Sequence, residues 1–95
     1  MTERFHIQAL GQVEGDRGWV NDLVIARWGA DVVVTRGIVH RPARLPGWVA
    51  WQSGERVGLL TYRLSGGACE IVTLDSLRPG MGVGTALIKA CLLYT

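Results

Sequence analysis

The sequence predicts one α+β domain over residues 1–95, in which flanking helices cover a mostly antiparallel sheet. Three apolar stretches follow one another with short turns between them, a pattern typical of an antiparallel meander. Stretches with helical periodicity lie on either side of this meander in the sequence. A chain of 95 residues is long enough to bury one core, though the margin of stability is thin.

The first part of the chain predicts a strand followed by a helix. Residues 4–10 alternate weakly between two faces, which indicates a half-buried strand. Residues 17–28 have helical spacing, with Asp16 as a cap before them and Gly29 as a stop after them. The expected buried stripe of this helix consists of Val20, Leu23, Val24 and Trp28.

A run of β-branched residues follows the first helix. Residues 32–39 predict one strand that is covered on both faces, in which Gly37 marks a bulge. The connection 41–47 has no periodicity, and its two prolines exclude a helix or a central strand.

The predicted meander occupies the centre of the chain. Its strands are expected at 48–52, 56–64 and 68–77, and the turn signals between them lie at 53–54 and 65–67. A final helix, 85–93, is apolar on nearly all sides and therefore needs cover on most of them.

Composition and charge exclude several classes of function. The net charge of +2 is too small and too dispersed to indicate a nucleic-acid partner. No segment has the length of apolar sequence that a membrane span requires, and residues 1–6 do not resemble a secretory signal. The sequence therefore predicts a cytoplasmic protein with no membrane partner.

The chain has two cysteines and two histidines, and neither pair forms a motif. Cys69 and Cys91 are interpreted as small packed hydrophobes, and a disulfide requires that their elements touch. His6 and His40 lie far apart without acids or cysteines at metal-ligand spacing. No metal site is predicted.

The most informative stretch is a strand, a glycine-rich turn and a helix near the C-terminus. Glycines 80, 82 and 84 precede the last helix, where free backbone N–H groups and the helix dipole favour a phosphate. A P-loop is excluded because no lysine follows Gly84 directly. A dinucleotide fingerprint is excluded because the glycine spacing differs. A helix start with purely structural glycines is the alternative.

The segment from Arg78 to Ile88 resembles the coenzyme A loop of the GNAT superfamily of N-acyltransferases, summarised as Gln/Arg-x-x-Gly-x-Gly/Ala. Gly82 and Gly84 match its two small positions. Pro79 stands where the motif has Gln/Arg, and Arg78 lies one residue earlier, from which it can supply charge to a phosphate. The order of predicted elements is also similar to that of this superfamily over nearly the whole chain.

This resemblance implies a GNAT-like fold, present as its N-terminal and central part, and transfer of an acetyl group from acetyl-CoA to an amine. The acceptor is a small-molecule or peptide amine that attacks the thioester directly, and backbone N–H groups at 74–77 polarise its carbonyl. The cofactor-binding residues are then Leu77, Arg78, Gly80, Met81, Gly82, Val83, Gly84 and Thr85. Asp75 is the candidate general base. The alternative is that Asp75 has a structural role as a hydrogen-bonded acid at the end of the strand. In this superfamily the first helix helps to form the acceptor site, so Trp19 or Trp28 could contact the substrate. Packing in the core is the preferred interpretation of both residues.

Two other functions remain open. The chain can be a non-catalytic GNAT-like module that binds coenzyme A or a protein partner, or an unrelated α+β module with a phosphate loop. Because no strand follows the last helix, we expect the sequence to be truncated at its C-terminal side. Such a chain would have an open sheet edge, through which a homodimer is expected.

Overall fold

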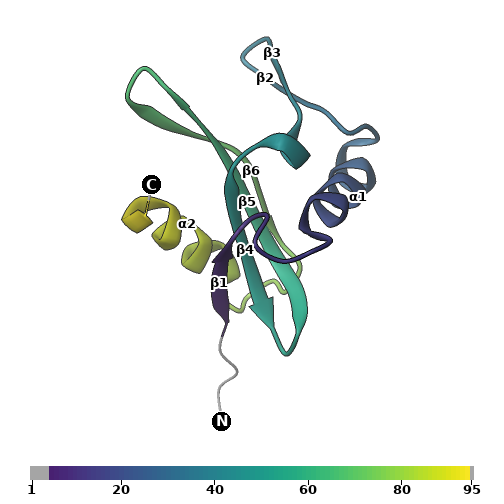
Figure 1. The fold of residues 1–95 in the computed structure, drawn as a ribbon, viewed down its shortest axis with the longest axis vertical. Coiled ribbons are helices and arrows are strands. Elements are labelled where there is room, and N and C mark those ends of the chain that lie inside the picture. The colour runs from purple at the N-terminus through teal and green to yellow at the C-terminus, as the bar shows by residue number, and fades with distance from the viewer. Residues whose placement is uncertain (1–4, 95) are drawn as a thin grey trace.

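The computed structural model describes residues 5–94 and shows a mixed α+β fold with a helix on each face of an antiparallel sheet (Figure 1). The elements are β1 (His6–Ala9), α1 (Asp16–Trp28), β2 (Val33–Thr35), β3 (Ile38–His40), the 3-10 helix η1 (Pro42–Arg44), β4 (Gly47–Gln52), β5 (Glu55–Ser65), β6 (Ala68–Ser76) and α2 (Val83–Tyr94). Arg4, where the first strand was expected to begin, lies outside the described residues.

The main sheet has the strand order β1-β4-β5-β6, and all of its neighbouring pairs are antiparallel. The predicted meander is confirmed, with β4, β5 and β6 joined by two-residue turns. Ser53 and Gly54 both have positive φ, as do Gly66 and Gly67, which is the geometry that a tight hairpin needs. β6 pairs with β5 on one side and forms an edge of the sheet on the other.

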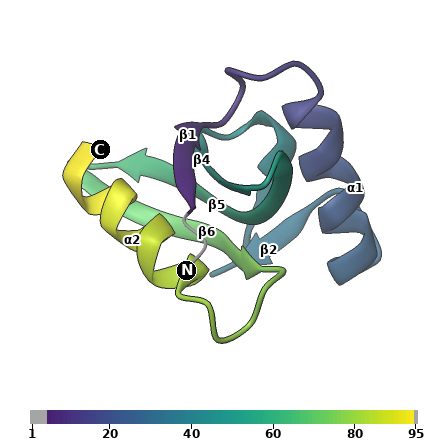
Figure 2. The ribbon, with the colours of Figure 1, turned by 90° about the horizontal axis from the view of Figure 1, so that it is seen from below.

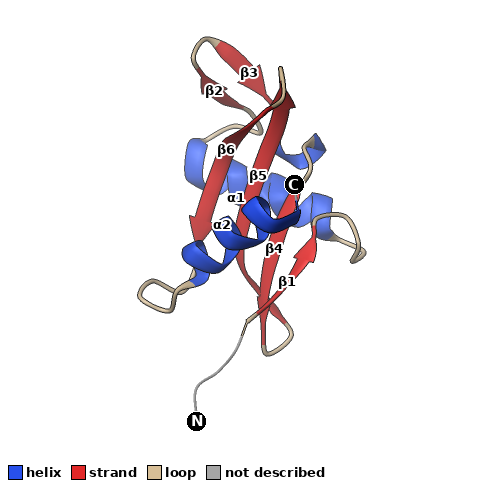
Figure 3. Ribbon diagram, turned by 90° about the vertical axis from the view of Figure 1, so that its left-hand side faces the viewer, coloured by secondary structure: helices blue, strands red, loops and turns tan. Residues whose placement is uncertain are grey.

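Two hydrophobic clusters lie on opposite faces of this sheet. The cluster beneath α1 contains Leu10, Val20, Val24, Val33, Val49, Leu59 and Val72. The cluster beneath α2 contains Ala50, Val57, Leu60, Val83, Leu87 and Cys91. Neighbouring residues of β4, Val49 and Ala50, belong to different clusters because successive strand residues face opposite ways. Figure 3 shows α2 crossing the sheet on the side opposite α1.

The expected single strand at 32–39 was wrong. The structure places a separate hairpin there, with Val33 opposite His40 and Thr35 opposite Ile38. Gly37 is a turn residue and not a bulge: Arg36 and Gly37 both have positive φ and form the two-residue turn. The expected burial on both faces also fails, because the hairpin leaves apolar side chains exposed at Val34, Ile38 and Val39.

The connection 41–47 contains a helical turn, which the prolines had been expected to exclude. Pro42 is the first residue of η1, where its fixed φ and its missing N–H are compatible with a helix. Proline disrupts a helix only in its interior.

The first helix differs from expectation at its start and in the extent of its buried stripe. It begins at Asp16, which is therefore its first residue and not its cap, and Gly15 precedes it in a left-handed conformation. Gly29 ends the helix as predicted, donating its N–H to the carbonyl of Ile25 at 2.8 Å. Trp28 is 59% exposed and does not belong to the core, so the predicted buried stripe ends at Val24.

The second helix is buried on one side only. Val83, Leu87, Ala90 and Cys91 face the sheet, whereas Leu92, Leu93 and Tyr94 are exposed. Although Tyr94 is exposed, its ring makes a tilted contact with that of Trp48, with 5.8 Å between the centroids. Among the described helices, none has the length and apolar character that crossing a membrane requires.

Candidate functional site

The glycine-rich loop connects the end of β6 with the start of α2 at one end of the sheet (Figure 2). Leu77 donates its N–H to the carbonyl of Val57 at 2.8 Å, which extends the ladder one residue beyond the strand. The Met81 N–H reaches the Arg78 carbonyl at 3.3 Å in a turn. Gly80 and Gly82 both have a φ of 80°, which a side chain would oppose. These two glycines are therefore required by the loop itself.

The first turn of α2 offers unpaired donors. Ala86 donates to the carbonyl of Gly82 at 3.0 Å, so this bond closes the first helical turn. Within residues 5–94, no backbone carbonyl accepts a hydrogen bond from the N–H groups of Val83, Gly84 or Thr85. These amides lie at the positive end of the helix dipole, so the arrangement suits an anion.

Gly84 differs from the other two glycines of the loop. It lies inside the helix, it is absent from the glycines with positive φ, and a Cβ at this position would meet nothing within 4 Å. Neither backbone conformation nor packing within the described chain requires glycine here. Alanine in a helix would be more stable by about 0.5–1 kcal/mol. Close approach of a ligand to the backbone would account for a glycine at this position.

Arg78, the candidate phosphate-binding cation, forms an ion pair with Glu55. Its Nη2 lies 3.0 Å from Oε2 of Glu55 in the β4–β5 turn region. Both side chains are about half exposed or more, at 48% and 68%. Ion pairs this exposed contribute little to stability, about 0–1 kcal/mol, so an incoming phosphate can compete for Arg78.

The other predicted loop residues have distinct surroundings. Met81 and Thr85 are exposed at the loop surface. Val83 is 1% exposed and packs in the cluster beneath α2, so only its backbone N–H is available to a ligand. Leu77 is half-buried, and its N–H is already used by Val57.

The edge of β6 leads directly into this loop. Because the Leu77 N–H points toward β5 and successive amides of a strand alternate in direction, the N–H groups of Leu74 and Ser76 point away from β5. Of the four amides at 74–77, these two are therefore the ones directed toward the open edge. An extended ligand arm can hydrogen-bond along them as an added strand would.

Asp75, the candidate base, lies on the other face of the sheet from α2. Its Oδ1 is 3.7 Å from Nε of Arg27, near the C-terminal end of α1, and its side chain is 19% exposed. The sequence gives no local signal for this pair, because the two residues are brought together by the packing of α1 against the sheet.

Trp28 follows Arg27 and is exposed, whereas Trp19 is partly buried against the core. Within residues 5–94, no group of three or more His, Cys, Asp or Glu side chains has a geometry that suits a metal ion.

Comparisons with known proteins identify similar chains in Bacillus subtilis (strain 168). The chain is 35% identical over 71 residues to uncharacterized protein YdhI, a match that covers 74% of this chain and 44% of YdhI. It is 36% identical over 73 residues to uncharacterized protein YxbD, covering 72% of this chain and 46% of YxbD. The chain thus spans less than half the length of these curated relatives. No protein-family profile matches it, and no solved structure matches it significantly.

Proposed function

We propose that this chain is part of an N-acetyltransferase domain of the GNAT superfamily, which binds acetyl-CoA through the loop between β6 and α2. The observation that supports it best is Gly84, a helical glycine that the surrounding chain does not require. Its position matches the second small residue of the coenzyme A loop motif. A pyrophosphate lying against the first turn of α2 would need a small residue here, and glycine meets that need.

The arrangement of elements supports the same proposal. A strand and a helix precede an antiparallel meander, and the glycine loop leads from the last meander strand into a helix on the sheet. This order is similar to that of the superfamily. The relatives are more than twice as long as the matched segment, so the activity of the whole protein is part of the proposal.

The cofactor would be held by backbone groups and one cation. The N–H groups of Val83, Gly84 and Thr85 would donate to pyrophosphate oxygens, and the Thr85 hydroxyl would add a further donor. Arg78 would exchange its exposed pair with Glu55 for a phosphate oxygen. Pro79 removes one donor from the loop, in contrast to the Gln/Arg of the motif.

The acyl group would lie along the edge of β6. In this arrangement the pantetheine arm follows the open edge, where the backbone groups of Leu74 and Ser76 are directed. An N–H at this edge would polarise the thioester carbonyl and stabilise the oxyanion that forms when an amine attacks it. The C–S bond then breaks, the thiolate of coenzyme A leaves, and the amide product retains the acetyl group.

Asp75 is the proposed proton acceptor for the attacking amine. Its carboxylate lies two residues before the loop, on the face that α1 covers, and it is partly exposed. It would accept the proton through a water molecule. Arg27 would then position this carboxylate, since the two side chains form an ion pair.

The test compares two helical glycines at which an added Cβ would meet no other atom within 4 Å. Gly18 lies in α1, and like Gly84 it has no positive φ and no atom within 4 Å of a built Cβ. Because the family motif tolerates alanine, leucine is the sharper substitution. We expect Gly84→Leu to weaken acetyl-CoA binding at least tenfold, about 1.4 kcal/mol, in isothermal titration calorimetry. Gly18→Leu should bind as the wild type does.

Thermal unfolding of both variants provides the control. Leucine has a higher helix propensity than glycine, so both substitutions should leave the melting temperature unchanged or raised. Equal binding by both variants, or no detectable binding of acetyl-CoA by folded wild-type protein, would refute the assignment of the loop.

A non-catalytic interaction module is the second candidate function. It is favoured by the exposed apolar side chains at the end of α2, where Leu92, Leu93 and Tyr94 are each more than 70% exposed. Release of free coenzyme A thiol in the presence of primary amines separates the two candidates. Binding without any thiol release would favour the module.

A further inference from the structure

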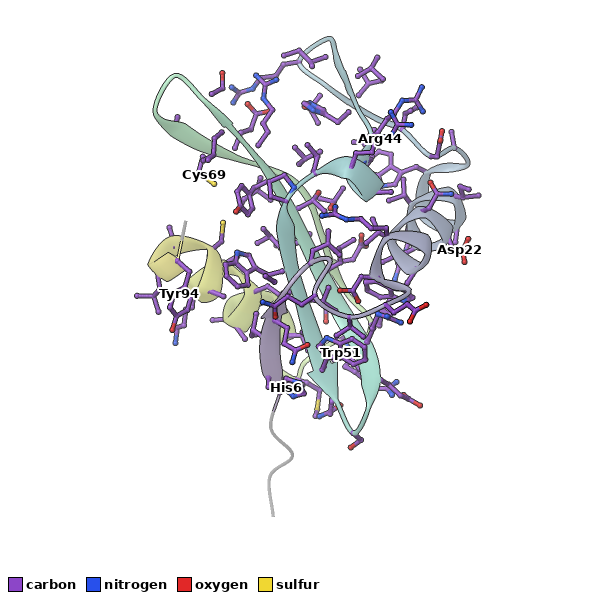
Figure 4. All side chains as sticks on the ribbon, in the orientation of Figure 1. His6, Asp22, Arg44, Trp51, Cys69 and Tyr94 are labelled. Atoms are coloured by element: carbon purple, nitrogen blue, oxygen red, sulfur yellow. The ribbon has the colours of Figure 1, made fainter. Side chains whose placement is uncertain are left out.

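The two cysteines of the chain meet between β6 and α2. The Sγ atoms of Cys69 and Cys91 lie 3.7 Å apart, although the residues are separated by 22 positions and belong to different elements. Both thiols are free. The expectation from the sequence that both are packed hydrophobes is correct for the buried Cys91 and wrong for the exposed Cys69. In Figure 4 the sulfur of Cys69 points toward α2.

We propose that Cys69 and Cys91 form a reversible redox site, at which a small-molecule disulfide oxidises the two thiols to an intramolecular disulfide that joins β6 to α2. This site is independent of the proposed coenzyme A loop and does not rest on acetyltransferase activity.

The unequal exposure of the two thiols sets the order of the reaction. Cys69 is on the surface, whereas Cys91 is 4% exposed behind it. The Cys69 thiolate attacks the disulfide RSSR, a mixed disulfide Cys69–S–SR forms, and the first RS⁻ leaves. The Cys91 thiolate then attacks the Cys69 sulfur and displaces the second RS⁻. Overall, two protein thiols lose two electrons and two protons, and RSSR becomes two RSH.

The surroundings of the pair allow this chemistry. A cavity of about 140 Å³ is lined by both cysteines together with Ile71, Ile88 and Leu92. It gives the sulfurs room to rotate from van der Waals contact to bonding distance. Partial desolvation of its sulfur raises the pKa of the exposed Cys69 thiol, and the hydrogen bond and charge of Cys91 raise it further. At neutral pH, Cys69 therefore attacks a disulfide more slowly than an ordinary exposed thiol does. The proposed site depends on the contact between the two thiols and not on unusual reactivity of Cys69.

The disulfide would close a covalent loop of the chain that contains the candidate site. The segment between Cys69 and Cys91 contains most of β6, the whole glycine loop and the first two turns of α2. Closing this loop covalently restricts the unfolded chain, and a loop of this length is expected to raise the melting temperature by about 15–25 °C.

The test uses the 95-residue chain reduced and then equilibrated in glutathione buffers of increasing oxidised fraction. We expect the intact mass to fall by two hydrogen atoms, the titratable thiols to disappear together, and peptide mapping to join residues 69 and 91. In Cys91→Ala the mixed disulfide cannot be resolved, so this variant should retain one glutathione on Cys69. In Cys69→Ser the buried Cys91 should remain free.

Two results would overturn the proposal. One is wild-type protein that stays reduced, or gains glutathione on both thiols, in fully oxidised buffer. The other is a disulfide that joins two chains, seen as a dimer on non-reducing electrophoresis. Circular dichroism of the reduced proteins checks that each variant is folded. If a variant does not fold, the mass and peptide map of the oxidised wild type still test the proposal.

Discussion

At the scale of single residues, the most constrained polar group is the carboxylate of Asp16. Its side chain is 1% exposed and accepts hydrogen bonds from the N–H groups of Gly11 and Val13 at 2.9 and 3.2 Å. Nε of Arg56 lies 2.9 Å from its other oxygen. The guanidinium of Arg56 also lies over the ring of Trp51, with 4.6 Å to the centroid. One carboxylate thus joins the loop after β1, the start of α1 and strand β5.

Removing this carboxylate leaves three donors without their acceptor. We therefore expect Asp16→Ala to lower the free energy of unfolding by about 3 kcal/mol, because a buried pair loses one partner and two amides lose their bonds. Asp22→Ala is the matched control: Asp22 lies on the same helix and is exposed, so its removal should change stability by less than about 0.5 kcal/mol. Urea unfolding measures both. Equal effects of the two substitutions would show that Asp16 does not join these elements.

At the scale of elements, the position of α2 depends on a glycine in the strand beneath it. A Cβ at Gly58 in β5 would overlap Cγ1 of Val83 and lie 3.0 Å from Cδ1 of Leu87. The helix can approach the sheet at this point only because no side chain intervenes. Since Val83 is also the first residue of α2, the same contact fixes where the glycine loop ends.

A double-mutant cycle tests this contact. Gly58→Ala should destabilise the fold by about 1–3 kcal/mol, because the added methyl group displaces α2 from the sheet. Adding Val83→Ala removes the side chain that clashes, so the double variant should be more stable than the sum of the single effects predicts by about 1 kcal/mol. Chemical unfolding of the four proteins supplies the cycle. Strictly additive effects would mean that α2 is positioned by other contacts.

Elements joined by local signals were predicted from the sequence, and those defined by distant contacts were not. The turns of the meander were evident in the sequence because Gly54, Gly66 and Gly67 tolerate the positive φ that a two-residue hairpin turn requires. The same signal is present at Arg36-Gly37, but the β-branched run around it favoured one continuous strand. Trp28 continues the helical stripe of α1 in the sequence, yet its side chain is 59% exposed in the structure.

The candidate site shows the same division. The glycines of the loop and their place before a helix were evident in the sequence, because they are contiguous. The partners Glu55 for Arg78, Arg27 for Asp75 and Cys91 for Cys69 were not predicted, since each pair is more than 20 residues apart and forms only when elements pack. Contacts of this kind depend on strand order and helix placement, and the periodicity of the sequence does not specify either in detail.

At the scale of the whole molecule, the sheet is covered on both faces but open along β6. Ile71 and Leu74 of this strand are each 43% exposed, and the backbone groups of Leu74 point away from β5. An unpaired strand edge with apolar side chains is a template for pairing with another strand. The edge proposed to bind the pantetheine arm is therefore also the edge through which we expect two copies of this chain to associate.

A charged side chain at the edge should prevent this association. We expect the sedimentation coefficient of the wild type to increase with protein concentration, and that of Leu74→Lys to stay at the monomer value, because lysine at an edge opposes strand pairing. Leu64→Lys is the matched control, since Leu64 is 66% exposed on β5 and pairs with Cys69, so it lies one strand away from the open edge of β6. Its behaviour should follow the wild type. If Leu64→Lys abolishes association as well, the contact depends on general surface hydrophobicity; if neither variant does, the copies meet through another surface, such as the exposed end of α2.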